Sequence, residues 1–374
     1  MMKRLFFSIA ILLSSITANA TNYFEKYEDI KNNFEYKTNS NLGVDNSFML
    51  QNFGSNTISR MLITPYFRKN IFDNLYGKTN LNFSMNIVRF NPHKPTNIAK
   101  KEKIATLFNS YDANYNELYE LYFSYKLPNK YNFITLGLGQ IPFSKFDSPI
   151  SSDLQNYYFF NTSLAQNATF TYPTSGIGGF IELTLNKDII FSLGAIEASN
   201  PLAEGMRFDN LNKYSSFVSI NYQPKYKNKY NGSYSLLLYD KPYVKKAPFS
   251  SQGWSLYLAQ DISKKHSLFF RLNSANSQYP TINRSYSFGI LIDNPFNLSS
   301  KDKFALGYSI NKINPKAFDD KIYNRYECII ESYYTHNINK RMSITPNIQL
   351  YLNRALSDDN KLSAVFSFNM QFNF

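Results

Sequence analysis

The residues that could do chemistry in this chain are charged side chains at alternate positions of apolar, strand-like segments. Glu120 lies between two apolar residues, and so does Arg271. Alternate residues of a β-strand point to opposite faces of a sheet, so each charge lies opposite an apolar face. Four further charged residues lie on the face opposite the apolar one of their segments: Arg325, Glu327, Glu331 and Arg341. Charges on the inner face of a water-filled barrel set the preference of the channel for solutes and make no covalent bond. These six residues are therefore predicted to line a pore.

Other chemistry finds little support in the sequence. The three histidines, His93, His266 and His336, lie far apart and in no spacing typical of metal ligands. A hydrolase would need a histidine folded next to a serine or an aspartate. The sequence thus predicts no enzyme activity, no metal and no cofactor. The single cysteine, Cys328, excludes an intrachain disulfide.

The formal net charge of +13 is not gathered in any block of five or more lysines and arginines. The short basic runs fall in expected loops and turns, which favours solvated loop charge and contact with anionic lipopolysaccharide over a nucleic-acid surface.

The elements that must position the charged residues are amphipathic strands, and the last stretch shows this best. Within 362–374 the even positions are apolar and the odd positions are mostly polar. Strict alternation of this kind indicates a strand between two different media. The apolar positions end on an aromatic residue and resemble the signal read by the outer-membrane barrel assembly machinery: Phe366, Phe368, Met370, Phe372 and Phe374.

The same alternation, interrupted by turn residues, predicts an all-β protein: a transmembrane antiparallel β-barrel of about sixteen strands. The expected strands are 45–53, 58–68, 76–90, 116–127, 131–141, 177–186, 189–197, 213–224, 231–240, 251–262, 266–275, 284–293, 302–313, 323–336, 341–353 and 362–374. An even count returns the C-terminus to the periplasmic side, with short periplasmic turns and longer outer loops. Phenylalanine, tyrosine and tryptophan together make up 17% of the chain, as aromatic girdles at both membrane interfaces would require.

The first residues are typical of a secretory signal peptide. Lys3 and Arg4 precede an apolar run, and Ala18-Asn19-Ala20 forms a cleavage site. We expect a signal peptide over 1–20 with cleavage after Ala20, a periplasmic lead segment over 21–44, and the barrel over 45–374. The predicted location is the bacterial outer membrane.

The longest connection, 142–176, is predicted to fold into the barrel and narrow it, because long loops inside compact folds are usually functional. Its expected constriction residues are Lys145, Asp147, Asp153, Tyr157 and Tyr158. An outward loop that faces lipopolysaccharide is the alternative.

Several stretches resemble the carbohydrate-selective porin family of the OprB type. They are 117–123 with 136–140, then 252–261 followed by 268–273, and most specifically Glu331-Ser-Tyr-Tyr with Met342-Ser-Ile-Thr-Pro-Asn-Ile-Gln. The resemblance implies a sixteen-stranded channel that passes sugars down their gradient. The chain departs from the family in having only 14 glycines and 1 tryptophan.

Two other functions stay open at this point. A general or anion-preferring porin would have the same strand pattern, and a surface adhesin or scaffold would be a barrel with a plugged lumen. The expected partners are outer-membrane lipid and lipopolysaccharide, small hydrophilic solutes and the barrel assembly machinery, and no nucleic acid. A monomer and a homotrimer are both compatible with the sequence.

Overall fold

The structure is a computed structural model, and it describes residues 40–373 apart from 54–55, 75–76, 92–98, 106–113, 129–130, 132, 148–158, 171–173, 199–212, 227–228, 245–250, 277–280, 319–320 and 360. The predicted signal peptide and most of the lead segment, and the residues Asp153, Tyr157, Tyr158 and Phe374, lie outside the described residues.

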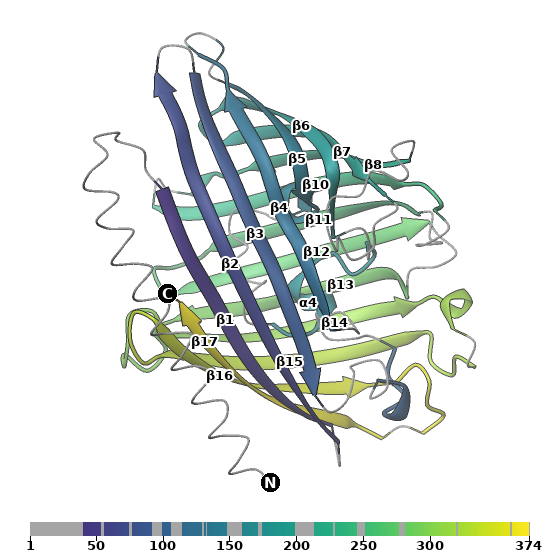
Figure 1. The fold of residues 1–374 in the computed structure, drawn as a ribbon. Helices are drawn as coiled ribbons and strands as arrows, with labels where there is room; N and C mark the ends of the chain where they lie inside the picture. The colour runs from purple at the N-terminus through teal and green to yellow at the C-terminus, as the bar shows by residue number, and fades with distance from the viewer. Residues whose placement is uncertain are drawn as a thin grey trace. The chain divides into compact units, whose positions relative to one another are not determined.

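Within this part the strands form one antiparallel sheet (Figure 1). They are β1 (Ser40–Phe53), β2 (Asn56–Asn74), β3 (Gly77–Asn91), β4 (Tyr115–Lys126), β5 (Ile134–Pro142), β6 (Ser175–Asn186), β7 (Ile189–Glu197), β8 (Tyr214–Tyr222), β9 (Lys225–Tyr226), β10 (Tyr230–Lys241), β11 (Ser251–Asp261), β12 (His266–Asn276), β13 (Ile282–Asp293), β14 (Lys303–Ile313), β15 (Tyr326–Asn337), β16 (Met342–Leu352) and β17 (Ser363–Asn373).

The sheet closes on itself because β1 pairs with both β2 and β17. The closing register runs from Asp45 opposite Asn373 to Phe53 opposite Val365. Closure satisfies the edge hydrogen bonds that a terminal strand would otherwise expose to aggregation. The prediction of an all-β antiparallel barrel with sixteen long strands is confirmed, and β9 is an additional two-residue pairing with β10 in the turn after β8.

Most strand boundaries differ from the predicted ones by one to three residues, and two differ by more: β1 begins earlier, and β2 ends at Asn74 instead of residue 68. β1 begins at Ser40 instead of residue 45, so the last part of the expected lead segment belongs to the barrel. β15 begins at Tyr326 and β16 at Met342, which leaves Arg325 and Arg341 just outside their strands, and both are exposed. Arg341 lies in the turn between these strands, where its backbone N–H donates to Asn339 Oδ1 at 2.8 Å. The alternation of apolar and polar residues continues in the sequence beyond the last paired residue, so it does not show where pairing between neighbouring strands ends.

Alternation along each strand separates an apolar outer face from an inner one. In β17, Phe366 and Phe368 are exposed, whereas Val365, Ser367 and Asn369 between them are buried. In β12, Leu268 and Phe270 are exposed while Phe269, Arg271 and Asn273 are buried. Exposed apolar rings on one face and buried polar groups on the other are the inverse of a soluble protein, and they fit an outer face in contact with lipid. No helix in the described ranges is both long enough and apolar enough to cross a membrane.

The two ends of the barrel carry different connections. The turn after β6 occupies 187–188 and the turn after β11 occupies 262–265, whereas 92–114 and 143–174 are long. The long connection 143–174 contains the short helices α3 (Ser144–Asp147) and α4 (Thr162–Ala165). Long connections at one end and short turns at the other identify the extracellular and periplasmic ends.

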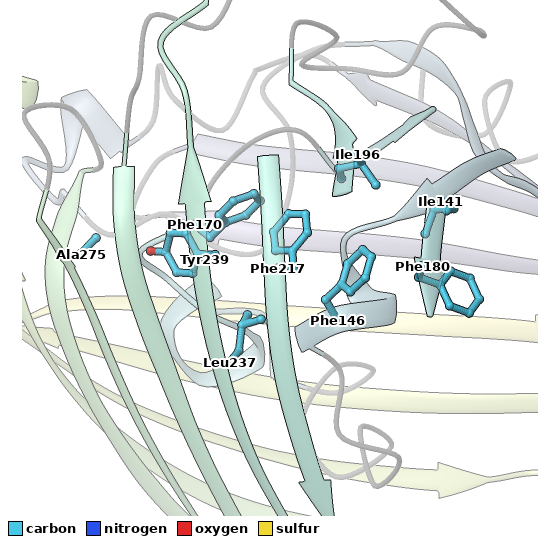
Figure 2. Packing of buried hydrophobic residues seen from close by; sticks show 9 residues of the cluster. All are labelled: Ile141, Phe146, Phe170, Phe180, Ile196, Phe217, Leu237, Tyr239 and Ala275. Carbon is cyan, nitrogen blue, oxygen red and sulfur yellow. The ribbon is translucent and has the colours of Figure 1, made fainter. Parts of the chain in front are cut away.

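A cluster of aromatic side chains joins this connection to the inner wall (Figure 2). Phe146 stacks on Phe217 with ring centroids 4.6 Å apart, and Phe170 packs edge-on against Tyr239 at 5.0 Å. A Cβ atom on Gly194 would lie 2.2 Å from the ring of Phe146, so the missing side chain leaves room for that ring. The hydrophobic core of this protein therefore lies inside the barrel.

Candidate functional site

The segment 159–170 is held inside the barrel by a carboxylate on the wall. Glu331 of β15 is fully buried and accepts hydrogen bonds from the backbone N–H groups of Phe160 at 2.6 Å and Asn161 at 3.0 Å. The side-chain amide of Asn347 on β16 donates a third, at 2.5 Å. Hydrogen bonds to a charged acceptor are stronger than neutral ones, so this carboxylate is a principal anchor of the segment.

Neighbouring strands add further contacts to the same segment. Ser287 Oγ donates to the carbonyl of Ser163 at 2.6 Å, and Asn311 Nδ2 donates to Ser163 Oγ at 3.1 Å. The ring of Phe159 lies edge-on to Phe269 and Tyr333, at 5.6 and 5.0 Å. Small polar residues on β13 and β14 thus leave space for the segment and bond to the backbone carbonyl and the hydroxyl of Ser163.

A buried ion pair fixes the first part of the connection. Arg271 Nη1 lies 3.0 Å from Asp147 Oδ2, with side-chain exposures of 1% and 7%. The guanidinium also lies 4.8 Å from the ring centroid of Tyr257. Burial raises the pKa of the Asp147 carboxyl, and the attraction of Arg271 offsets part of that rise. Because removing one partner leaves an unpaired buried charge, this pair ties α3 firmly to β12.

A second connection also enters the barrel. Glu327 of β15 accepts hydrogen bonds from the backbone N–H groups of Ala105 at 2.9 Å and Ala355 at 3.0 Å. Arg354 donates to the carbonyl of Glu102 at 2.9 Å. The connections after β3 and after β16 are therefore joined through one wall carboxylate.

The predicted pore-lining residues consequently divide into three groups. Arg271, Glu327 and Glu331 point inward but are at most 1% exposed, because the inserted connections cover them. Arg325 and Arg341 lie outside their strands, as described above. Glu120 is half-buried on the inner face of β4 and keeps exposed surface in the lumen. Of the predicted constriction residues that the structure describes, Lys145 is partly exposed and Asp147 is buried in its ion pair.

The inner faces of the first strands differ from those of the later ones. Many inward residues of β1–β4 stay half-buried or exposed, among them Asp45, Tyr66, Arg68, Glu120 and Tyr122, whereas others nearer the extracellular end, such as Met49, Ile58 and Val88, are buried. Inward residues of β11–β16 are mostly buried under the inserted connections. Solvent in the lumen therefore reaches these half-buried and exposed inward residues of the β1–β6 wall, which together we call the open wall. It is kept from most inward residues of the β8–β16 wall, which we call the covered wall.

Charges of both signs alternate around the open wall. Lys145 Nζ of α3 lies 2.9 Å from Glu182 Oε1 of β6 and 4.7 Å from the ring centroid of Phe180. Glu120 of β4 interacts electrostatically with both Lys145 and Arg68 of β2. The acid Glu120 thus lies between the bases Arg68 and Lys145, and a second acid, Glu182, pairs with Lys145. This arrangement provides donors and acceptors for hydrogen bonds without a strong field of one sign.

Several residues of the open wall were not among the predicted site residues: Asp45, Tyr66, Arg68, Tyr122 and Glu182. Arg68 could have been found from the sequence, because it is the last residue of the predicted strand 58–68 and lies on the inward face of that strand. Glu182 could have been found by parity on the predicted strand 177–186. What the sequence lacked was any indication of which inward charges the connections would cover.

Histidine pairs do occur, but outside the lumen. His336 Nδ1 lies 2.9 Å from Asp302 Oδ2, and His266 Nδ1 lies 2.8 Å from Ser263 Oγ. Asp302 also accepts from Tyr334 at 2.8 Å and from the backbone N–H of Asn337 at 2.8 Å, so it stabilises the turn before β14. Ser263 likewise accepts from the backbone N–H of His266 in a tight turn. Among the described residues no group of histidine, cysteine, aspartate and glutamate is arranged to hold a metal ion.

Comparison with known proteins agrees with a closed porin barrel. The sequence model for the carbohydrate-selective porin, OprB family, matches residues 72–374. The chain belongs to this family. It is an outer-membrane porin, and carbohydrate selectivity fits the family.

Similar proteins include Porin AaxA of Chlamydia felis (strain Fe/C-56), 29% identical over 352 residues, which are 90% of this chain and 79% of that protein. Porin AaxA of Chlamydia pneumoniae is 31% identical over 295 residues, 78% of this chain and 66% of that protein. Both are porins by name.

Solved structures show the same fold at low sequence identity. The high-pH structure of Pseudomonas putida OprB superposes with a TM-score of 0.72 at 13% identity, covering 90% of this chain and 94% of that one. The anion-selective porin from Comamonas acidovorans gives a TM-score of 0.58 at 12% identity, covering 90% and 100%. These likenesses concern the barrel and carry no information on the solute.

Proposed function

We propose that this porin lets small, uncharged hydrophilic solutes, carbohydrates among them, diffuse passively along its open wall. The observation that carries this proposal is the alternation of Arg68, Glu120, Lys145 and Glu182 beside the half-buried rings of Tyr66 and Tyr122. A sugar hydroxyl both donates and accepts hydrogen bonds, so a wall with both partners suits it. Aromatic rings add apolar surface for the less polar faces of a sugar ring.

The same alternation speaks for weak selection between ions. The net charge of +13 belongs to the whole chain and includes loops and the leader. On the open wall, Arg60, Arg68 and Lys145 are matched in number by Asp45, Glu120 and Glu182. An anion-preferring porin would need a wall dominated by positive charge, as rings of like charge produce.

The test is single-channel conductance of the refolded mature chain in a planar bilayer, with glucose and then maltose added. We expect saturable block by sugar and a reversal potential near zero in a salt gradient. Tyr66→Ala and Tyr122→Ala should each weaken the block by about fivefold to tenfold, since one aromatic contact contributes about 1 kcal/mol.

Arg341→Ala serves as a control, because this exposed turn residue lies away from the open wall. Steps that sugar does not affect would contradict the proposal and leave a general porin. A well-folded barrel that gives no steps would favour the surface scaffold.

The export and assembly of the chain belong to the same proposal. We propose cleavage after Ala20 and recognition of the last strand by the barrel assembly machinery, supported by the exposed rings of Phe366 and Phe368 on the lipid-facing side of β17. Mass spectrometry of the protein from outer membranes tests the cleavage site. Deletion of Phe374 tests the assembly signal through the amount of folded barrel.

A further inference from the structure

The outer face of the barrel carries a row of polar side chains at the ends of four adjacent strands. Ser216 on β8 lies opposite Asp240 on β10, which lies opposite Gln252 on β11, which lies opposite Asn276 on β12. All four are exposed, and their positions alternate with buried inward residues. Their side chains make no hydrogen bond to another residue in the described part of the chain. These strand ends adjoin the long connections and so lie at the extracellular end.

The next outward residues form a mixed apolar and polar row just below. It consists of Val218, Leu238, Trp254 and Ser274, again opposite one another on the same strands. Trp254 is the only tryptophan in the chain, and its side chain is 39% exposed. Both rows border a groove of ≈ 490 Å³ on the outer face. Its volume is in the range of ordinary small-molecule sites.

A second groove on the same side of the barrel is apolar and lies closer to the periplasmic end. It has a volume of ≈ 590 Å³ and is bordered by Leu258, Leu268, Phe270, Phe288 and Leu306, among others. The two grooves share β11 and β12. From Trp254 to Leu258 is four residues along β11, or about 13 Å at the rise of a strand. Because strands of membrane barrels tilt by about 35–45°, this length corresponds to about 10 Å of depth, which lies within one leaflet of about 15 Å of hydrocarbon.

We propose that the two grooves together bind one glycolipid of the outer leaflet, with its sugar headgroup at Trp254 and an acyl chain along the apolar groove. The polar row offers a carboxylate that accepts hydrogen bonds and amides and hydroxyls that donate and accept, which is what a hydroxyl-rich headgroup requires. The indole of Trp254 supplies an apolar face with a polar tip at the membrane interface. The matching order of polar and apolar surface along β11 and β12 points to a single amphiphile that occupies both grooves.

Trp254 makes the test direct, because all tryptophan fluorescence of this protein comes from the proposed site. The full mature chain is reconstituted into phosphatidylethanolamine vesicles with increasing fractions of rough-type lipopolysaccharide. We expect a saturable change in the emission of Trp254 that phosphatidylglycerol does not produce. Asp240→Ala combined with Gln252→Ala should raise the half-saturating fraction by about tenfold, as expected for two lost hydrogen bonds.

Asn52→Ala is the matched control, because Asn52 is an exposed polar residue on the outer face of β1, away from both grooves. It should leave the titration unchanged. Trp254→Ala removes the fluorescence, so for that variant we expect less lipopolysaccharide retained on the purified, folded barrel by native mass spectrometry.

An emission that does not depend on lipopolysaccharide would overturn the proposal. The same change with phosphatidylglycerol would overturn the headgroup contact, and the same change with free maltose would overturn the role of the acyl chain.

Discussion

The open wall and the covered wall of this barrel have the same strand pattern and different environments. On β4, Glu120 points inward and keeps exposed surface, and it interacts with the charges of Arg68 on β2 and Lys145 on α3. On β15, Glu331 also points inward, yet it is fully buried and binds the backbone of an inserted segment. An inward carboxylate can therefore select solutes or anchor a connection. Which of the two it does depends on whether the connection covers it.

Loss of a covered carboxylate should have the largest effect. Glu331→Ala removes the acceptor of three hydrogen bonds and leaves buried donors unsatisfied, so we expect the free energy of unfolding to fall by about 3 kcal/mol. Release of the segment should also raise the single-channel conductance. Denaturant titration and planar-bilayer recording measure the two effects.

Glu331→Gln keeps the shape of the side chain and one acceptor oxygen, so an intermediate loss of stability is expected. If Glu331→Ala changed ion selectivity but not stability, Glu331 would face the lumen like Glu120, and the distinction between the open wall and the covered wall would be wrong.

Loss of Asp302, a carboxylate that stabilises a turn outside the lumen, should destabilise the barrel without raising the channel conductance. The hydrogen bonds from Asn337, His336 and Tyr334 outweigh the effect of burial and hold the pKa of Asp302 below its ordinary value of 3.8. A carboxyl with a depressed folded-state pKa contributes stability above its ordinary pKa, and this contribution is lost as the pH falls through the folded-state pKa.

Asp302→Asn should therefore lower stability at pH 7 by about 1–3 kcal/mol, and the difference from the unmodified protein should shrink below about pH 3.8. Denaturant titrations at several pH values test this. A rise in conductance would show that this turn also controls the inserted segment.

Loss of a charge on the open wall should change selectivity and leave stability nearly unaltered. Lys145 and Glu182 are 25% and 20% exposed, so their ion pair contributes about 1 kcal/mol at most. Lys145→Ala leaves three acids against Arg60 and Arg68, and we expect the reversal potential to shift toward cation preference. Arg341→Ala removes the same charge from an exposed turn and should leave the reversal potential as it was.

The smallest effect is expected from a change in the space beside the open wall. A Cβ atom on Gly43 would lie 2.3 Å from the hydroxyl of Tyr66, so Gly43→Ala must displace that ring. Displacement of Tyr66 within the lumen should reduce the conductance modestly, by roughly a tenth to a third, with little change in stability because the end of the ring can move. An unchanged conductance together with unchanged sugar block would place Tyr66 away from the solute path.

Most of the fold was predictable because a barrel in a membrane obeys a local rule. Each strand separates lipid from the interior, so apolar and other residues alternate along it, and sixteen such segments could be counted. The ends of strands were less predictable. Arg325 and Arg341 continue the alternation of β15 and β16, but the paired registers of these strands end short of both. Arg325 keeps one backbone hydrogen bond to β14, which its carbonyl accepts from the N–H of Ile313 at 2.9 Å.

The candidate site was predictable only in part. The sequence indicated that 142–176 enters the barrel, and the structure places α3 and α4 of this connection against the inner wall. It did not indicate which wall the connection covers, nor that a second connection is bound by Glu327.

The sequence by itself determined the strands, their two faces and the direction in which each charged side chain points. The tertiary structure alone decided that Arg271, Glu327 and Glu331 anchor connections while Arg68, Glu120 and Lys145 face the lumen. The reason is physical: side-chain direction follows from the local geometry of a strand, whereas burial depends on contacts such as Phe160 with Glu331, which are 171 residues apart along the chain.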